Sequence, residues 1–265
     1  MYFLLCFTDT YTWYLFPVGE NRLYGYEPML NMSFESDELS SGIKVATKKN
    51  VQGIQIPQAS EIDLRDFASP CFKNATVCIG FSVSFLVYIV GPVNVGESMK
   101  ILDSNSSLRG SYHVQFIVRR TAARLEGHAY VVGDNSSTIL DRKIAFPATD
   151  TWVHVAIVYS AVSTSLELYV NSVMVTAGDA VVSSPWQSDN SAVHLSLGSR
   201  TNVHDIFVSY LQVIKGTLTA TEVAQLEKES REQGKSNKFM RCTHFPGEVI
   251  FGLIMGKKVE CFLYR

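Results

Sequence analysis

Residues 152–160 read WVHVAIVYS, and residues 166–172 read LELYVNS a few positions later. Both stretches are rich in β-branched and aromatic residues. Their apolar side chains recur at every second position, which is the period of a strand with one face in a core. Asn171 can adopt the positive φ that a tight hairpin turn requires. The two stretches therefore predict adjacent antiparallel strands within two stacked sheets.

Similar short β-rich runs surround this hairpin. Residues 81–90 (FSVSFLVYIV) are apolar on one face and partly apolar on the other, as expected for a central strand. Further runs cover residues 113–118, 128–132, 193–197 and 206–214. One helix is expected, because Thr219 and Glu222 can form a capping box and Gly234 supplies a stop. The predicted fold class is all-β: a two-sheet antiparallel jelly-roll sandwich with one short C-terminal helix.

Four segments carry a family resemblance. Residues 152–172 resemble the core hairpin of laminin-G-like and pentraxin-like domains of the concanavalin A-like lectin/glucanase superfamily, where W-x-H-V-A-x-x-Y leads into L-x-L-Y-V-N-G. Residues 71–85 (CFKNATVCIGFSVSF) resemble the start of the family's long central strand, and residues 197–200 (LGSR) resemble its L-G-x strand end. Residues 208–226 resemble the pattern I-D-D-V-x-I-Y-x-x-x-L-S-x-x-E-I.

The resemblance implies a concanavalin A-like domain over residues 10–232, followed by a C-terminal extension over residues 233–265 whose structure it does not address. It also implies a non-catalytic module that binds a glycan or an extracellular protein, through rim loops or the concave sheet. Calcium is the only cofactor that it suggests. The family's acidic pair falls on Ser209 and Tyr210 here, which weakens the case for calcium.

Cysteines and sequons indicate an extracellular setting. The number of cysteines is odd, five, so at least one is unpaired within the chain. Cys71 and Cys78 could close a small loop, and so could Cys242 and Cys261, whereas the partner of Cys6 stays open. Asn-x-Ser/Thr sequons, which are candidate glycosylation sites in a secreted protein, begin at Asn31, Asn74, Asn105 and Asn135.

Charge and hydropathy exclude two other classes. The net charge of −2 gives no basic excess for nucleic acid. No stretch reaches the roughly 18 apolar residues of a spanning helix. Residues 1–7 (MYFLLCF) lack the charged start and the length of a signal peptide. We therefore expect a part of a larger secreted or membrane protein.

Candidate ligand-binding residues are few. Calcium would need oxygen ligands gathered on loops, and the acids expected on loops are Asp103, Asp134, Asp141 and Asp205, although their spacing assembles no site. Trp186, in an expected loop, is the best candidate for stacking against a sugar. The histidines show no metal-binding spacing; His113 and His128, on presumed neighbouring strands, are the nearest to a zinc pair.

Two alternative functions remain open. Residues 61–66 (EIDLRD) are similar to the active strand of glucanases of the same fold, in which two carboxyl groups share one face. Glu61 and Asp63 would share a face here, but Asp66 replaces the second glutamate, and no tryptophan-rich groove surrounds the segment. The second alternative is a structural spacer without a ligand.

Overall fold

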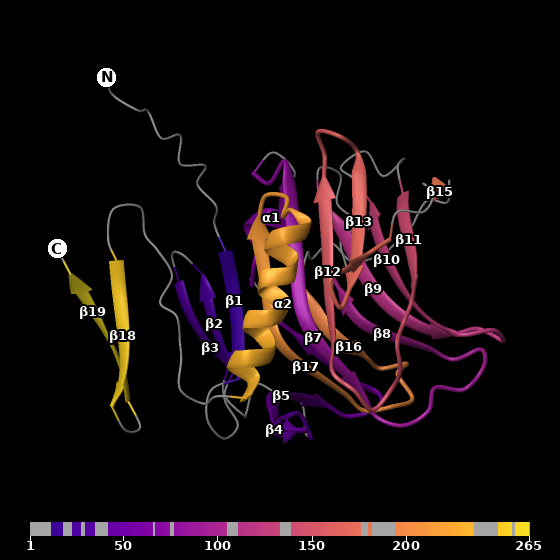
Figure 1. The fold of residues 1–265 in the computed structure, drawn as a ribbon, viewed down its shortest axis with the longest axis horizontal. Helices are drawn as coiled ribbons and strands as arrows, with labels where there is room; N and C mark the ends of the chain where they lie inside the picture. The colour runs from indigo at the N-terminus through magenta and orange to yellow at the C-terminus, as the bar shows by residue number, and fades with distance from the viewer. Residues whose placement is uncertain are drawn as a thin grey trace.

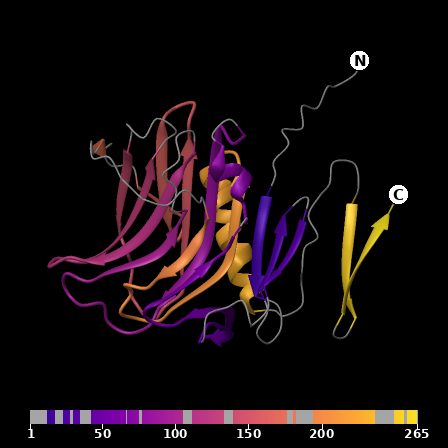
Figure 2. The ribbon, with the colours of Figure 1, turned by 180° about the vertical axis from the view of Figure 1, so that it is seen from behind.

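The computed structural model describes residues 12–17, 23–27, 30–34, 42–65, 67–74, 77–104, 111–132, 139–175, 180–181, 194–235, 249–255 and 258–264. Two antiparallel sheets pack face to face, with a long helix on the outer face of the larger sheet (Figures 1 and 2). The predicted all-β sandwich is therefore confirmed.

The larger sheet has ten strands. Its main path runs in the order β14 (Val173–Met174), β13 (Ser165–Val170), β12 (Val153–Ser160), β7 (Gly80–Ile89), β17 (Ile206–Lys215), β1 (Thr12–Pro17), β2 (Leu23–Glu27) and β3 (Leu30–Phe34). The hairpin of β4 (Lys44–Lys48) and β5 (Val51–Ile56) joins through β17.

The second sheet has seven strands. Its order is β15 (Ala180–Val181), β11 (Ile139–Ala145), β10 (Leu125–Val132), β9 (His113–Arg120), β8 (Ser98–Asp103), β16 (Ser196–Ser199) and β6 (Ser60–Asp63). Within the described part of the chain, β18 (Val249–Met255) and β19 (Lys258–Tyr264) pair only with each other.

The hairpin that decides the fold has the predicted geometry. Strands β12 and β13 are antiparallel partners, with Val155 opposite Val170 and Tyr159 opposite Leu166. The second stretch, residues 166–172, ends in a turn at Asn171 and Ser172, whose φ angles are 48° and 61°. Both residues thus adopt the left-handed conformation that a two-residue hairpin turn demands. Strand β7 lies between β12 and β17, which confirms its central position.

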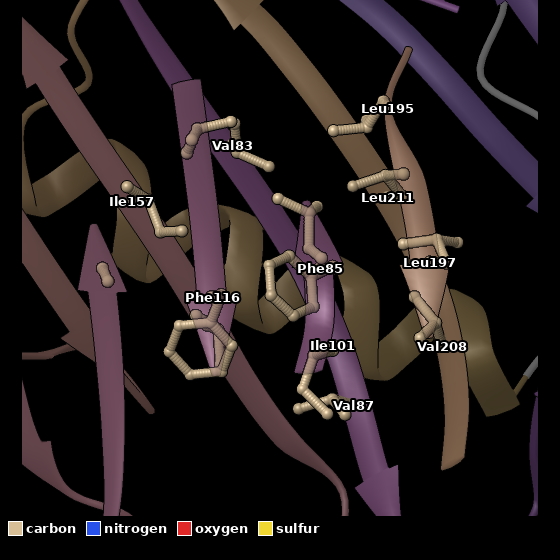
Figure 3. Close-up of a cluster of buried hydrophobic side chains, with 14 of the residues drawn as sticks. Val83, Phe85, Val87, Ile101, Phe116, Ile157, Leu195, Leu197, Val208 and Leu211 are labelled. Carbon is tan, nitrogen blue, oxygen red and sulfur yellow. The ribbon is translucent and has the colours of Figure 1, made fainter. Parts of the chain in front are cut away.

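The core lies between the two sheets. Val83, Phe85 and Val87 of β7 are inaccessible to solvent, and they face apolar side chains of the second sheet such as Ile101 and Phe116 (Figure 3). The rings of Phe85 and Phe116 meet edge to face with centroids 5.7 Å apart. Burial of this apolar surface is the main favourable contribution to folding.

Strand β17 changes its partner at a bulge. Residues 206–208 pair with β5, and residues 211–214 pair with β1. The register with β7 shifts between Ser209 and Gln212, and Tyr210 has a φ of 50° there. The buried Ser209 hydroxyl donates to the carbonyl of Gln52 in β5. The position where the family often has an acidic pair therefore holds a strand junction in this chain.

The two helices differ from expectation in detail. Helix α2 (Ala220–Lys235) starts at the predicted capping box: Thr219 N donates to Glu222 Oε2 at 2.7 Å, and Glu222 N donates to Thr219 Oγ1. It runs one residue past Gly234, the predicted stop. The short helix α1 (Ser69–Lys73) was not expected. Pro70 lies in its first turn, where a proline is tolerated because the backbone N–H that it lacks would have no partner within the helix. Among the described residues, neither helix is long and apolar enough to cross a membrane.

Candidate ligand-binding face

The outward face of the seven-stranded sheet carries an ordered array of polar side chains. On β9, Val114, Phe116 and Val118 are fully buried in the core, so the intervening side chains point outward. The strand register places one residue from each of four neighbouring strands in line. This polar row consists of Asp103 of β8, Gln115 of β9, Tyr130 of β10 and Asp141 of β11. Four strands at about 4.8 Å spacing give the row a length of roughly 14 Å.

A second row lies beside the first. It consists of Lys100, Ile117, His128 and Lys143, again one from each of β8 to β11. Lys100 Nζ contacts Asp103 Oδ2 at 2.6 Å, and Lys143 Nζ contacts Asp141 Oδ2 at 3.2 Å. Each end of the polar row therefore carries a carboxylate paired with the lysine of its own strand.

Asp103 is the best-connected group of the face. Its carboxylate accepts hydrogen bonds from Lys100 Nζ, from His113 Nε2 at 2.9 Å and from Gln115 Nε2 at 3.0 Å. Burial by itself would raise the pKa of Asp103, but the hydrogen bonds and charges of His113 and Lys100 outweigh burial and hold the pKa well below its usual range. The carboxylate thus stays ionised in a nearly inaccessible position.

His128 and Tyr130 form the middle of the array on β10. Their rings stack with centroids 6.1 Å apart, His128 Nδ1 lies 3.2 Å from the Tyr130 hydroxyl, and His128 Nε2 lies 3.3 Å from Glu126 Oε2. Burial lowers the pKa of His128 and raises the pKa of Tyr130. At neutral pH this pair is therefore an uncharged aromatic surface between two ion pairs.

Exposure divides the face into two layers. The inner layer, Asp103, His113, Gln115, His128 and Asp141, is 3–7% exposed. The outer layer consists of the tips that solvent reaches, because the side chains of Lys100 and Lys143 are 35% and 53% exposed and Tyr130 is half-buried. The inner layer holds the outer groups in place, and the outer groups can meet a ligand.

The expected loop acids are placed differently. Asp103 and Asp141 lie on strands β8 and β11 and are buried, so their expected place in loops was wrong: the polar runs that suggested loops begin after Asp103 and end before Asp141. Asp205 does precede a strand, and it accepts hydrogen bonds from Gln55 Nε2 and Gln58 N. Asp134 lies outside the described residues. Among the residues that are described, no three His, Cys, Asp or Glu side chains gather as a metal site.

The cysteine, glycosylation and stacking candidates are only partly visible. Cys71 and Cys78 are joined by a disulfide with Cα atoms 5.1 Å apart. Asn74 is exposed inside that loop. Asn105, Asn135, Trp186 and Cys242 lie outside the described residues, and the side chains of Asn31 in β3 and Cys261 in β19 are not described.

Among the described residues, no hydrogen bond or ion pair joins Glu61 or Asp63 of the glucanase-like segment to another carboxyl group. Glu61 and Asp63 lie on β6, which is at the edge of the sheet and not at its centre. Asp63 accepts a hydrogen bond from Arg65 N and contacts His194 Nδ1 at 3.0 Å. Asp66 lies outside the described residues. His113 and His128 are on neighbouring strands as presumed, but each contacts a different carboxylate.

The array as a whole was not predicted from the sequence. The signal was present in part, because residues 113–116 alternate polar and apolar positions and residues 126–130 place Glu, His and Tyr at every second position. The register that aligns Gln115 with Tyr130, and Tyr130 with Asp141, comes only from the structure.

Comparison with known proteins supports the fold. No curated protein matches the chain. Among solved structures, the receptor-binding domain of botulinum neurotoxin D matches with a TM-score of 0.56 and 11% identity over 82% of this chain and 52% of its own. The receptor-binding domain of botulinum neurotoxin type G matches with a TM-score of 0.52 and 12% identity over 82% of this chain and 50% of its own. The chain thus spans about half the length of these structures.

The family relationship rests on a longer sequence pattern. A family model described as the concanavalin A-like lectin/glucanases superfamily matches residues 69–224, which is more than half of the chain. The matched region starts at helix α1, includes the core hairpin and the whole polar row, and ends within helix α2. The chain therefore belongs to the concanavalin A-like lectin/glucanase superfamily, with a laminin-G-like domain.

Proposed function

We propose that the protein is a non-catalytic extracellular recognition module that binds glycans on the outward face of strands β8 to β11. The observation that carries this proposal is the polar row, in which Asp103, Gln115, Tyr130 and Asp141 are in register across four strands. Its length of roughly 14 Å suits an oligosaccharide of about three rings lying across the strands.

The chemistry of the array suits carbohydrate. Sugars present hydroxyl groups that donate and accept hydrogen bonds, and C–H faces that pack on aromatic rings. Tyr130 offers an aromatic surface and a hydroxyl, and Lys100 and Lys143 offer donors on both sides of it. Buried partners fix these side chains in advance, which reduces the entropy lost on binding.

The charge distribution favours anionic glycans. The carboxylates of Asp103 and Asp141 are buried and paired, whereas the cationic tips of Lys100 and Lys143 reach solvent, and Arg119 on the same face is exposed. A ligand approaching this face meets the cations first. Binding to sulfated or carboxylated sugars should therefore exceed binding to neutral ones, and it should weaken as salt increases.

Catalysis has less support. Retaining glycoside hydrolases need two carboxyl groups about 5–5.5 Å apart. Asp103 and Asp141 stand at opposite ends of the row, and Glu61 and Asp63 lie on the edge strand β6. A spacer without a ligand would have no need for an aligned set of paired lysines and acids on one face.

A glycan array tests the proposal. The wild-type chain is compared with the double variant Tyr130→Ala/Lys143→Ala and with the control Lys44→Ala/Lys215→Ala, which removes charges from the other sheet. We expect binding to anionic glycans that falls at least tenfold in the first variant only. Absence of any glycan binding, or equal loss in the control, would rule the site out. Turnover of a labelled β-glucan, lost in Glu61→Gln/Asp63→Asn, would support the hydrolase instead.

A further inference from the structure

A buried polar layer separates helix α2 from the ten-stranded sheet. Ser82 and Ser84 of β7, His154 of β12 and Gln212 of β17 point away from the core, and each is at most 7% exposed. Figure 1 shows α2 lying over this outer face of the sheet. Most of the contact between the two sheets is apolar, so this polar layer under a helix is a distinct feature of the fold.

His154 is the titratable member of the layer. The residue is inaccessible to solvent, its Nε2 lies 2.9 Å from Ser84 Oγ, and its Nδ1 has no hydrogen-bond partner among the described residues. A neutral imidazole has one N–H that donates and one nitrogen that accepts, and the site offers the ring a single hydroxyl, that of Ser84. A doubly protonated ring would have a buried N–H without an acceptor and a buried positive charge, both of which are costly.

Helix α2 is attached by two unlike contacts. In its first half, Val223 is fully buried against Ala156, Val158 and Tyr169. The side chains of the helix are described for residues 220–232. Val223 is the one apolar residue among them that has less than a tenth of its surface exposed. The first half is therefore held by the hydrophobic effect.

The second half of α2 is held by polar groups next to His154. Arg231 Nη2 donates to Asn171 Oδ1 at 2.8 Å, and the same Asn171 oxygen accepts from the backbone N of His154 at 3.0 Å. Arg231 Nε contacts Glu227 Oε1 at 2.9 Å, and the Ser172 hydroxyl donates to Glu227. This second half has few apolar contacts, so it can separate from the sheet without opening the core.

We infer that His154 is an acid-sensitive latch: when its imidazole takes up a second proton, the second half of helix α2 leaves the sheet. The charged groups that face the ring are Glu227 and Arg231, both from α2. Strands β7 and β17 and the turn after β13 present the uncharged Ser84, Gln212 and Asn171. Release hydrates the ring, and it separates Arg231 from the new cation.

The electrostatics have the required sign. Burial lowers the pKa of His154 to about 4; Glu227 opposes this effect and Arg231 adds to it. The pKa of His154 with the helix docked lies below the free value of about 6.5. The contribution of neutral His154 to the docking of α2 is therefore complete above pH 6.5 and is lost as the pH falls toward 4. At pH 5 the equilibrium between released and docked helix should shift toward release by roughly 30-fold relative to pH 7.5.

Amide hydrogen exchange, corrected for the intrinsic pH dependence of the exchange rate, tests the latch. At pH 5.0 we expect peptides over residues 225–235 to lose roughly 30-fold of the protection they have at pH 7.5. Peptides over β7 should keep theirs. His154→Gln should remove the difference, and the control His204→Gln, at a half-buried histidine that contacts Glu97, should keep it. Protection that is independent of pH in the wild type, or lost equally in His154→Gln, would overturn the inference.

A measurement on the wild type covers the case in which His154→Gln does not fold. The imidazole of His154 can be titrated by NMR in the intact chain. A pKa below 5, with the α2 resonances shifting on the same titration, supports the latch. A pKa near 6.5, or titration without any change in α2, contradicts it.

Discussion

Asp103 and His113, on the neighbouring strands β8 and β9, form a nearly inaccessible pair in which His113 Nε2 lies 2.9 Å from Asp103 Oδ1. Asp103 also accepts hydrogen bonds from Lys100 and Gln115. A buried carboxylate is stable only when such partners replace its water. The pair therefore organises one end of the polar row.

Replacing Asp103 by asparagine should destabilise the protein at neutral pH. The variant removes a buried charge but leaves its three donors facing a neutral amide, and we expect a loss of about 2–3 kcal/mol in the free energy of unfolding. Because the folded pKa of Asp103 is lowered, its stabilising contribution is complete above about pH 4 and is lost as the pH falls below that value. Urea denaturation at pH 7, 5 and 3 should thus show a difference between wild type and variant that shrinks at pH 3. A constant difference would contradict this account.

Replacing Asp141 by asparagine is the matched case at the other end of the row. Asp141 is as buried as Asp103. Among the described residues, however, its carboxylate forms an ion pair only with Lys143, and its Oδ1 has no hydrogen-bond partner. An amide relieves the desolvation of that charge, so we expect a free energy of unfolding within about 1 kcal/mol of the wild type. Denaturation at pH 7 measures it. A loss as large as that of Asp103→Asn would show that Asp141 is bound more tightly than its contacts indicate.

The fold could be predicted from sequence because local and global signals agree. The alternation over residues 152–172, the central strand over residues 81–90 and the capping box at Thr219 each specify an element without long-range information. Strands β1 and β5 were not predicted individually, because both pair with β17, whose residues lie more than 100 positions away in the chain. Such non-local pairing leaves little trace in a short window of sequence.

The candidate site was harder to predict for the same reason. No member of the polar row stands out in the sequence of its own strand, because the row is formed only when the register between strands aligns the four residues. Asp103 and Asp141 were expected in loops, because acids next to Ser-, Asn- and Gly-rich runs usually lie there. The partners Lys100 and Lys143, two or three positions away on the same strands, are what permit a carboxylate to be buried.

Gly198 should be intolerant of any side chain. It lies in β16 with a φ of +78°, and an added Cβ would come within 2.7 Å of the backbone oxygen of Ser60 in β6. Backbone strain and this clash together should make Gly198→Ala cost about 3–4 kcal/mol. Gly96, with a φ of +91° and no atom within 4 Å of an added Cβ, provides the control, and Gly96→Ala should cost only about 1–2 kcal/mol. Chemical denaturation of the two variants compares them directly. Equal costs would show that strain alone, without the contact to β6, decides both.

The disulfide between Cys71 and Cys78 should stabilise the domain mainly through the unfolded state. It closes a loop with a sequence separation of seven and is followed at once by the central strand β7. Loop-closure entropy for so short a loop corresponds to about 2.5 kcal/mol. The double variant Cys71→Ala/Cys78→Ala should lower the free energy of unfolding by about that amount, plus a contribution from the lost burial of two inaccessible sulfur atoms. Treatment of the wild type with a reductant isolates the first contribution, because it keeps both sulfur atoms in place. If reduction left the denaturation midpoint unchanged while the double variant lost stability, the effect would come from packing and not from the cross-link.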